Sequence, residues 1–261
     1  MRQANAGYFR NGLPYTRFDR GPRPLVVFQG LFFENKPQPS LITQMYNFLG
    51  QDYTGYSVLR KPGMPRGYTM RDMADDYAAM IRDEFGGPVD VLGISTGGSI
   101  VQPFAADHPD LVRRLVIHSS AYRLSERARA LQMEVGRLAA ERRWRAAWTT
   151  MLRFTLQPKW LAGPLAWFAS LLLALDRPAD PSDLVITVEA EDQFNFRERL
   201  AEITAPTLVI AGEHDPFYSA ELFRETAAGI PNARLILYPN MGHPASGKQF
   251  ARDVLAFLQE E

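Results

Sequence analysis

The 261-residue sequence contains no cysteine. This absence excludes disulfide bonds, thiolate metal sites and a cysteine nucleophile, and it fits a reducing compartment. Net charge is absent too, because 29 basic residues balance 29 acidic ones. Without a basic field the chain has no electrostatic attraction for nucleic acid or an anionic membrane surface. We therefore expect nucleic acid not to be a partner.

Long apolar runs are scarce as well. The first twenty residues are polar, with Arg2, Arg10 and Arg17 among them, so we see no secretory signal. Residues 160–175 are apolar apart from Ser170, but this run is shorter than the roughly 18 to 20 residues that span a bilayer. We expect a cytoplasmic protein without a membrane span. The run is interpreted as a helix packed on the core, or as the lining of a lipophilic pocket.

Hydrophobic residues make up 46% of the chain, which is enough for one large domain core. Short apolar runs of strand type alternate with segments of helical periodicity. The strand-like runs are residues 25–28, 56–59, 89–92, 115–117, 206–211 and 235–237. This alternation predicts an α/β fold with a mostly parallel sheet covered on both faces. Residues 7–18 precede it and predict a hairpin, with Asn11-Gly12 as a type I′ turn.

The alternation stops at about residue 121 and returns at about residue 195. Between these points we find only helix signals, such as the spacing of Leu124, Leu131 and Leu138 on one face. The sequence therefore predicts a core formed by residues 1–120 and 195–261, with an all-helical insertion at residues 121–194.

One stretch carries the strongest signal for chemistry. Residues 89–92 form a strand-like run that is apolar apart from Asp90, and Gly93-Ile94-Ser95-Thr96-Gly97 leads directly into a predicted helix. A strand that turns into a helix through Gly-x-Ser-x-Gly is typical of a nucleophile elbow, which exposes the serine hydroxyl above the sheet. Glycines fit two residues to either side, where a Cβ would clash. The alternative is a small residue in a tight turn.

A serine hydroxyl needs a base to take its proton, and a histidine held by a carboxylate serves this role. Of the four histidines, His243 lies in a loop after the last predicted strand. Asp215 lies in the loop after residues 206–211, and Glu213 is the alternative acid. Because the carboxyl ends of parallel strands meet at one edge of a sheet, these loops should converge near Ser95.

With its motifs at residues 93–98, 212–215 and 242–243, in the order Ser, Asp, His, the chain resembles the α/β-hydrolase fold family. The resemblance runs from the hairpin to the last helix and implies an eight-stranded-type sheet with a helical cap. It implies Ser95 as nucleophile, His243 as general base and acid, and Asp215 as the orienting carboxylate. The backbone N–H groups of Leu31 and Thr96 would form the oxyanion hole.

The loop before Leu31 departs from the family pattern, since Gln29-Gly30 stands where members often have His-Gly. We expect Phe32 and Trp160 to contact the substrate. The function that the resemblance implies is hydrolysis of carboxylic esters of small, rather apolar acyl compounds, without metal or organic cofactor. A lactonase, a thioesterase and a C–C bond hydrolase would use the same triad. A relative that binds ligands without turnover is the alternative of another class. The oligomeric state is not indicated.

Overall fold

The computed structural model describes residues 5–19, 21–38, 44–50, 52–156, 159–175 and 177–260. Within them the chain forms an eight-stranded sheet in the order β1-β2-β4-β3-β5-β6-β7-β8. The strands are β1 (Asn5–Tyr8), β2 (Pro14–Asp19), β3 (Arg23–Phe28), β4 (Tyr53–Val58), β5 (Val89–Ile94), β6 (Val112–His118), β7 (Thr207–Gly212) and β8 (Ala233–Tyr238). β2 is antiparallel to β1 and β4, while all other neighbours are parallel. The predicted mostly parallel sheet is confirmed.

The central strands are apolar on both faces because both faces are covered. All six residues of β5 and of β7 are buried. Side chains alternate along each strand, so Val26 belongs to one core cluster and Val27 to the other. A helix layer on each side of the sheet is what such strands need.

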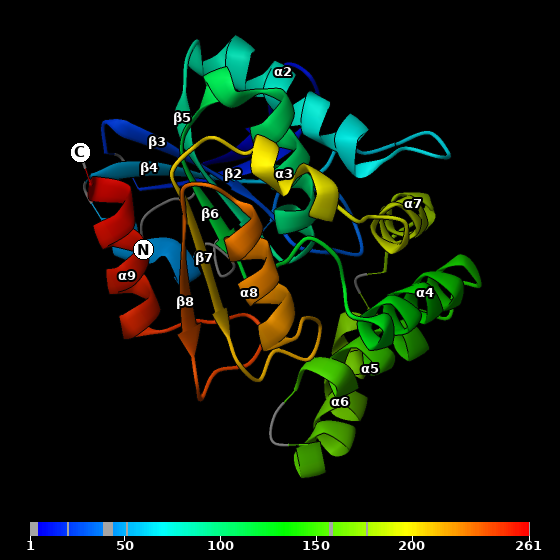
Figure 1. Ribbon diagram of the computed structural model, residues 1–261. Helices are drawn as coiled ribbons and strands as arrows, with labels where there is room; N and C mark the ends of the chain where they lie inside the picture. The colour runs from blue at the N-terminus through cyan, green and yellow to red at the C-terminus, as the bar shows by residue number, and fades with distance from the viewer. Residues whose placement is uncertain are drawn as a thin grey trace.

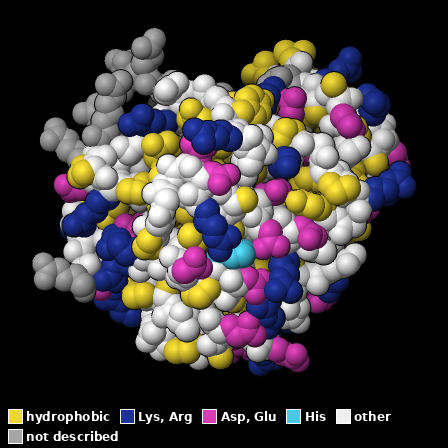
Figure 2. Space-filling model, turned by 90° about the horizontal axis from the view of Figure 1, so that it is seen from above, with side chains coloured by type: hydrophobic (Ala, Val, Ile, Leu, Met, Phe, Trp, Pro, Cys, Tyr) yellow, Lys and Arg dark blue, Asp and Glu magenta, His cyan; other side chains and the backbone are white. Residues whose placement is uncertain are grey.

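Helices cover both faces, as Figure 1 shows. α2 (Met70–Phe85), α3 (Thr96–Asp107) and α8 (Ala220–Gly229) pack on one face, with the short helices η2 (Pro109–Leu111) and η3 (Arg197–Glu202) nearby. α9 (Lys248–Gln259) and η1 (Gln44–Leu49) cover the other face. The sequence also predicts a helix over residues 41–49, and this range lies partly outside the described residues, which begin again at 44. Figure 2 shows acidic and basic side chains interspersed over the face seen from above.

The N-terminus of α2 is set by a capping box. The Thr69 side chain accepts from the Asp72 N–H, and the Asp72 carboxylate accepts from the Thr69 N–H at 2.8 Å. The N–H groups of Asp72 and Thr69, which have no acceptor within the helix, each gain a side-chain acceptor in this way. Gly86 ends the helix with φ of 68°, which a residue without a Cβ adopts at little cost. The sequence alone predicts Thr69 as the cap of this helix and Gly86-Gly87-Pro88 as its stop, and both are observed.

The hairpin is present, but its predicted turn type is wrong. Phe9 N–H donates to the Leu13 carbonyl, so the connection is longer than two residues. Only Gly12 adopts positive φ there, at 90°. The side chain of Asn11 instead accepts from Leu13 N–H and donates to the Asp76 carbonyl on α2. That contact with α2 competes with the left-handed conformation that a type I′ turn requires.

In the described residues four α-helices lie between β6 and η3: α4 (Glu126–Ala140), α5 (Trp144–Thr155), α6 (Lys159–Leu173) and α7 (Ser182–Asp192). We call them the helical insertion, and α4, α5 and α6 lie to one side of the sheet in Figure 1. α6 buries a stripe of small residues, Ala162, Ala166 and Ser170, and packs against α5. Its Phe168 is 65% exposed and its Leu172 is 64% exposed. The described part of the chain holds no helix with the length and apolarity that a membrane span requires.

Candidate active site

Ser95 stands at the junction of β5 and α3 with a strained backbone. Its φ is 53° and its ψ is −123°, a region that residues with a Cβ rarely adopt. It is the only half-exposed residue in the run from Val89 to Ile100, where all the others are buried. The sharp turn therefore presents this one side chain outward at the carboxyl edge of the sheet.

The turn depends on close backbone approaches at two glycines. A Cβ on Gly97 would lie 1.9 Å from the Phe28 carbonyl oxygen. A Cβ on Gly93 would lie 2.6 Å from the Gly97 carbonyl oxygen. Neither distance is available to a real side chain, so the predicted need for glycine on each side of Ser95 has a measurable steric origin.

His243 and Asp215 lie together on adjacent loops after β8 and β7. His243 Nδ1 is 2.7 Å from Asp215 Oδ2, and both side chains are buried, at 9% and 0% exposed. The other carboxylate oxygen accepts from the N–H groups of Phe217 and Tyr218. Asp215 is thus fixed by the backbone of its own loop and turned toward the imidazole.

The loop of His243 is hydrogen-bonded to residues that adjoin Ser95. The His118 carbonyl accepts from the Ser95 N–H at 3.0 Å, and the His118 Nε2 donates to the Ala245 carbonyl at 2.7 Å. Ser119 Oγ accepts from the Ala245 N–H at 3.0 Å. The end of β6 therefore connects the serine turn to the residue two positions after His243.

The other acid and histidine candidates lie apart from this pair. Glu213 is exposed and forms an ion pair with Arg224 at 3.6 Å. His214 is exposed, and its backbone N–H donates to the Met241 carbonyl. His108 ends α3 and contacts Asp75 at 2.8 Å. His118 is fully buried against Phe250, and burial lowers its pKa to about 3, an effect that the nearby His243 reinforces.

The loop after β3 lies against the serine. A Cβ on Gly30 would be 3.3 Å from the Ser95 Cβ. Among the described residues, the N–H groups of Leu31 and Thr96 donate no hydrogen bond to the protein. First-turn N–H groups of a helix have no acceptor within the helix, which explains the free donor at Thr96. Gln29, which replaces the histidine common in the family, is buried and donates to Ser57 Oγ.

Aromatic side chains from the insertion approach the site. Phe33 stacks on Trp148 of α5 with ring centroids 3.8 Å apart, and Leu31 packs against the same cluster. Phe154, also on α5, packs edge-on against Phe217, whose ring lies 4.6 Å from that of His243. Phe32, which the sequence favoured as a substrate contact, is half buried. The side chain of Trp160 lies outside the described residues.

Two buried charged side chains were not predicted from the sequence. Arg60 follows β4 and donates through Nη1 to the carbonyls of Gln29 and Gly30. Glu191, on α7, accepts from Thr96 Oγ1 and Ser99 Oγ, both at 2.8 Å. An acid within the apolar stretch of α7 was the available signal, but nothing local indicates its partners. Within the described chain, no three metal-binding side chains are grouped closely enough to hold an ion.

Comparison with known proteins agrees with this fold. The sequence profile described as the alpha/beta hydrolase family matches residues 31–253, and the chain belongs to this family. A putative carbamate hydrolase RutD from Serratia proteamaculans (strain 568) is 27% identical over 238 residues, covering 85% of each chain. A pimeloyl-acyl-carrier-protein methyl ester esterase from Nitrosomonas europaea is 28% identical over 179 residues, covering 66% of this chain and 71% of the relative.

Among solved structures, the alpha/beta hydrolase MGS-M2, from a Medee basin deep-sea metagenome library, superposes with a TM-score of 0.81. The two chains are 16% identical, and the match covers 98% of each. At this identity the likeness concerns the fold alone. The two sequence relatives are described as a putative carbamate hydrolase and as a methyl ester esterase, so their descriptions name different bonds.

Proposed function

We propose that this protein is a serine hydrolase that cleaves carboxylic esters of small, rather apolar acyl compounds. The observation that carries the proposal is the strained backbone of Ser95 beside a histidine–carboxylate pair. Hydrogen bonds of His118 and Ser119 connect the serine turn to the loop of His243. The imidazole of His243 is in turn paired with the buried carboxylate of Asp215. A strained serine costs stability that an ordinary turn would not, and such strain concentrates at functional sites.

The proposed reaction has two halves. Ser95 Oγ attacks the ester carbonyl carbon while its proton passes to His243 Nε2, and the Asp215 carboxylate holds the imidazole by Nδ1. The tetrahedral oxyanion receives hydrogen bonds from the Leu31 and Thr96 N–H groups. The C–O bond then breaks, and the alcohol leaves with the proton from His243. Water then gives a proton to His243 and attacks the acyl carbon, the bond from that carbon to Ser95 Oγ breaks, and His243 returns the proton to Oγ as the acid leaves.

The surroundings favour an apolar acyl group. Phe217 lies against His243, and Phe154 of α5 lies against Phe217. Aromatic side chains beside the imidazole offer apolar contact area and exclude water from the oxyanion. In this proposal the helical insertion, residues 121–194, is the cap that shapes the acyl pocket.

Lactones, thioesters and C–C bonds beside a carbonyl could react at the same triad. A carbamate is a further candidate, because the relative from Serratia is described as a putative carbamate hydrolase. A panel of p-nitrophenyl esters of rising chain length, run beside a lactone, a thioester and an aryl carbamate, ranks these substrates by kcat/KM.

A protein of this fold that only binds ligands is the alternative of another class. Labelling with a fluorophosphonate probe separates the two. We expect covalent labelling that is lost in Ser95→Ala and retained in Ser57→Ala, a buried serine that contacts Gln29. Absence of both labelling and turnover in the folded wild-type protein would favour the binding protein.

A further inference from the structure

Two opposite charges are buried beside Ser95, and the reaction above uses neither. Arg60 is 1% exposed and Glu191 is 0% exposed. Burial lowers the pKa of Arg60 and raises that of Glu191, although each charge favours the ionised form of the other. Burying charged groups costs free energy that apolar residues would not cost, so their contacts need an explanation.

Arg60 lies against the loop that carries the first proposed oxyanion donor. Its Nη1 donates to the Gly30 carbonyl at 2.9 Å and to the Gln29 carbonyl at 3.1 Å. The Gly30 carbonyl and the Leu31 N–H belong to one peptide group. A charge-assisted hydrogen bond to that carbonyl fixes the plane of the peptide and polarises its N–H, which makes it a stronger donor.

Glu191 fixes the backbone on the other side, at the turn that follows Ser95. Its Oε2 accepts from Thr96 Oγ1, and its Oε1 accepts from Ser99 Oγ. These bonds fix the first turn of α3, where the Thr96 N–H is the second proposed donor. A carboxylate near the first turn of a helix also interacts favourably with the helix dipole.

We propose that Arg60 and Glu191 are positioning residues that hold the two walls of the oxyanion hole, Arg60 at the Leu31 loop and Glu191 at the Thr96 turn. The proposal rests on the proposed serine-hydrolase function. Because Glu191 belongs to α7, the helical insertion takes part directly in setting the geometry at Ser95.

This arrangement predicts a kinetic signature. Neither side chain contacts the acyl group in the proposed reaction, so ground-state binding should be unaffected. The oxyanion exists only in the transition state and the intermediate. Weaker hydrogen bonds from the Leu31 and Thr96 N–H groups should therefore lower kcat and leave KM unchanged. Loss of a whole oxyanion donor costs about 10²–10³ in kcat, and we expect a misaligned donor to cost about 10–100-fold.

The variants are Arg60→Met, Arg60→Lys and Glu191→Gln, assayed on one p-nitrophenyl ester. We expect kcat to fall 10–100-fold in Arg60→Met with KM within about twofold, and Arg60→Lys to restore part of it because an ammonium can still donate to one carbonyl. Glu191→Gln should lower kcat less. Affinity for a boronic acid that becomes tetrahedral on Ser95 should weaken in step with kcat.

Arg114→Met is the matched control. Arg114 is 7% exposed, lies near the amino end of β6 and donates to the Glu260 carbonyl. It should lower the melting temperature but leave kcat unchanged. If Arg60→Met does not fold, Arg60→Lys and Glu191→Gln decide by the same kcat and KM measurements.

Wild-type kcat in a folded Arg60 variant, or a loss confined to KM, would overturn the positioning role. If the wild-type protein neither labels at Ser95 nor hydrolyses any ester, the proposed function fails instead. The two failures are therefore separable.

Discussion

His118 Nε2 donates a 2.7 Å hydrogen bond to the carbonyl of Ala245, two residues after His243. The imidazole is fully buried, and its Nδ1 has no partner among the described residues. The bond to Ala245 requires a proton on Nε2, so a neutral ring satisfies the contact with Nδ1 unprotonated. His118 therefore supports the loop of His243 in its uncharged form.

This buried imidazole should make the fold sensitive to acid. Burial lowers the folded-state pKa of His118 to about 3, while an unfolded histidine protonates near pH 6.5. Below about pH 6.5 the unfolded chain gains a proton that the fold excludes, so stability falls by about 1.4 kcal/mol per pH unit toward pH 3. Urea unfolding of wild type and His118→Gln at pH 7 and pH 4.5 measures this loss.

Glutamine keeps an N–H for the Ala245 carbonyl but does not titrate. His118→Gln should therefore lose less stability than wild type between the two pH values, even if it is less stable at pH 7. Equal losses in both proteins would show that His118 is not the source of the acid sensitivity.

Asp215→Asn should separate folding from catalysis. Asn can still accept from the Phe217 and Tyr218 N–H groups, but its amide N–H₂ cannot accept from His243 Nδ1. The imidazole would then take the wrong tautomer, and kcat should fall about 10³–10⁴-fold with the melting temperature nearly unchanged. Glu213→Gln is the control and should remain within a few-fold of wild type. A loss in Glu213→Gln rather than in Asp215→Asn would reverse the assignment of the acid.

The glycines of the serine turn offer a steric test. Gly97→Ala places a Cβ 1.9 Å from the Phe28 carbonyl oxygen, so the backbone must move, which we expect to cost about 2–4 kcal/mol of unfolding free energy. Gly87→Ala is the control, because an added Cβ would meet no described atom within 4 Å. It should change stability by less than about 0.5 kcal/mol. Similar denaturation midpoints for both variants would contradict the close approach at Gly97.

The sequence predicted the parts of the fold that depend on local patterns. The strand period of β5, the Thr69 cap and the Gly-x-Ser-x-Gly turn each follow from neighbouring residues, and the structure contains them. The pairing of Asp215 with His243 followed from the shared edge of parallel strands, although their catalytic roles stay a prediction. The predicted type I′ turn at Asn11 was wrong because the Asn11 side chain contacts Asp76, a residue far along the chain.

Side-chain contacts between segments that are far apart in the chain could not be predicted from local sequence patterns either. Nothing beside Arg60 indicates that it contacts the loop at Gly30, 30 residues earlier. Likewise Glu191 and Thr96 are 95 residues apart. The sequence favours Phe32 as a substrate contact, which stays a prediction, but it does not indicate that the adjacent Phe33 stacks on Trp148. The conformation of the loop after Leu31 decides which phenylalanine packs on α5, and a loop has no sequence periodicity from which that conformation could be predicted.

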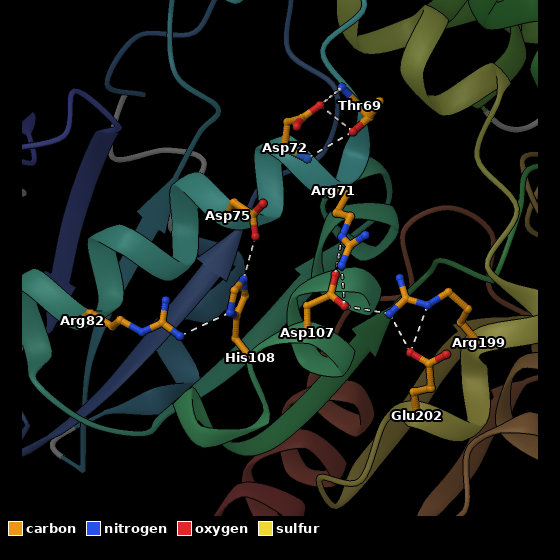
Figure 3. Close-up of polar contacts among 9 residues, drawn as sticks. All are labelled: Thr69, Arg71, Asp72, Asp75, Arg82, Asp107, His108, Arg199 and Glu202. Carbon is orange, nitrogen blue, oxygen red and sulfur yellow. Dashed lines mark hydrogen bonds and ion pairs between the residues drawn. The ribbon is translucent and has the colours of Figure 1, made fainter.

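The last prediction concerns Asp107 at the end of α3, which joins three elements (Figure 3). Its carboxylate contacts Arg71 of α2 at 2.9 Å and Arg199 of η3 at 2.7 Å. Burial acts to raise the pKa of Asp107, but the hydrogen bonds and charges of Arg199 and Arg71 outweigh it and hold the pKa below its ordinary value. The stability contributed by ionised Asp107 is therefore present at neutral pH and lost as pH falls through that lowered pKa.

Asp107→Asn should lower the unfolding free energy by about 1 kcal/mol at pH 7, because Arg71 and Arg199 lose a shared anion at a site only 13% exposed. The difference from wild type should shrink in acid as the wild-type carboxyl itself becomes neutral. Glu202→Gln, which removes the more exposed partner of Arg199, should have a smaller effect at pH 7. Chemical denaturation at pH 7 and pH 3.5 checks both. A difference between Asp107→Asn and wild type that grows toward pH 3.5 would mean that the two arginines do not stabilise the anion.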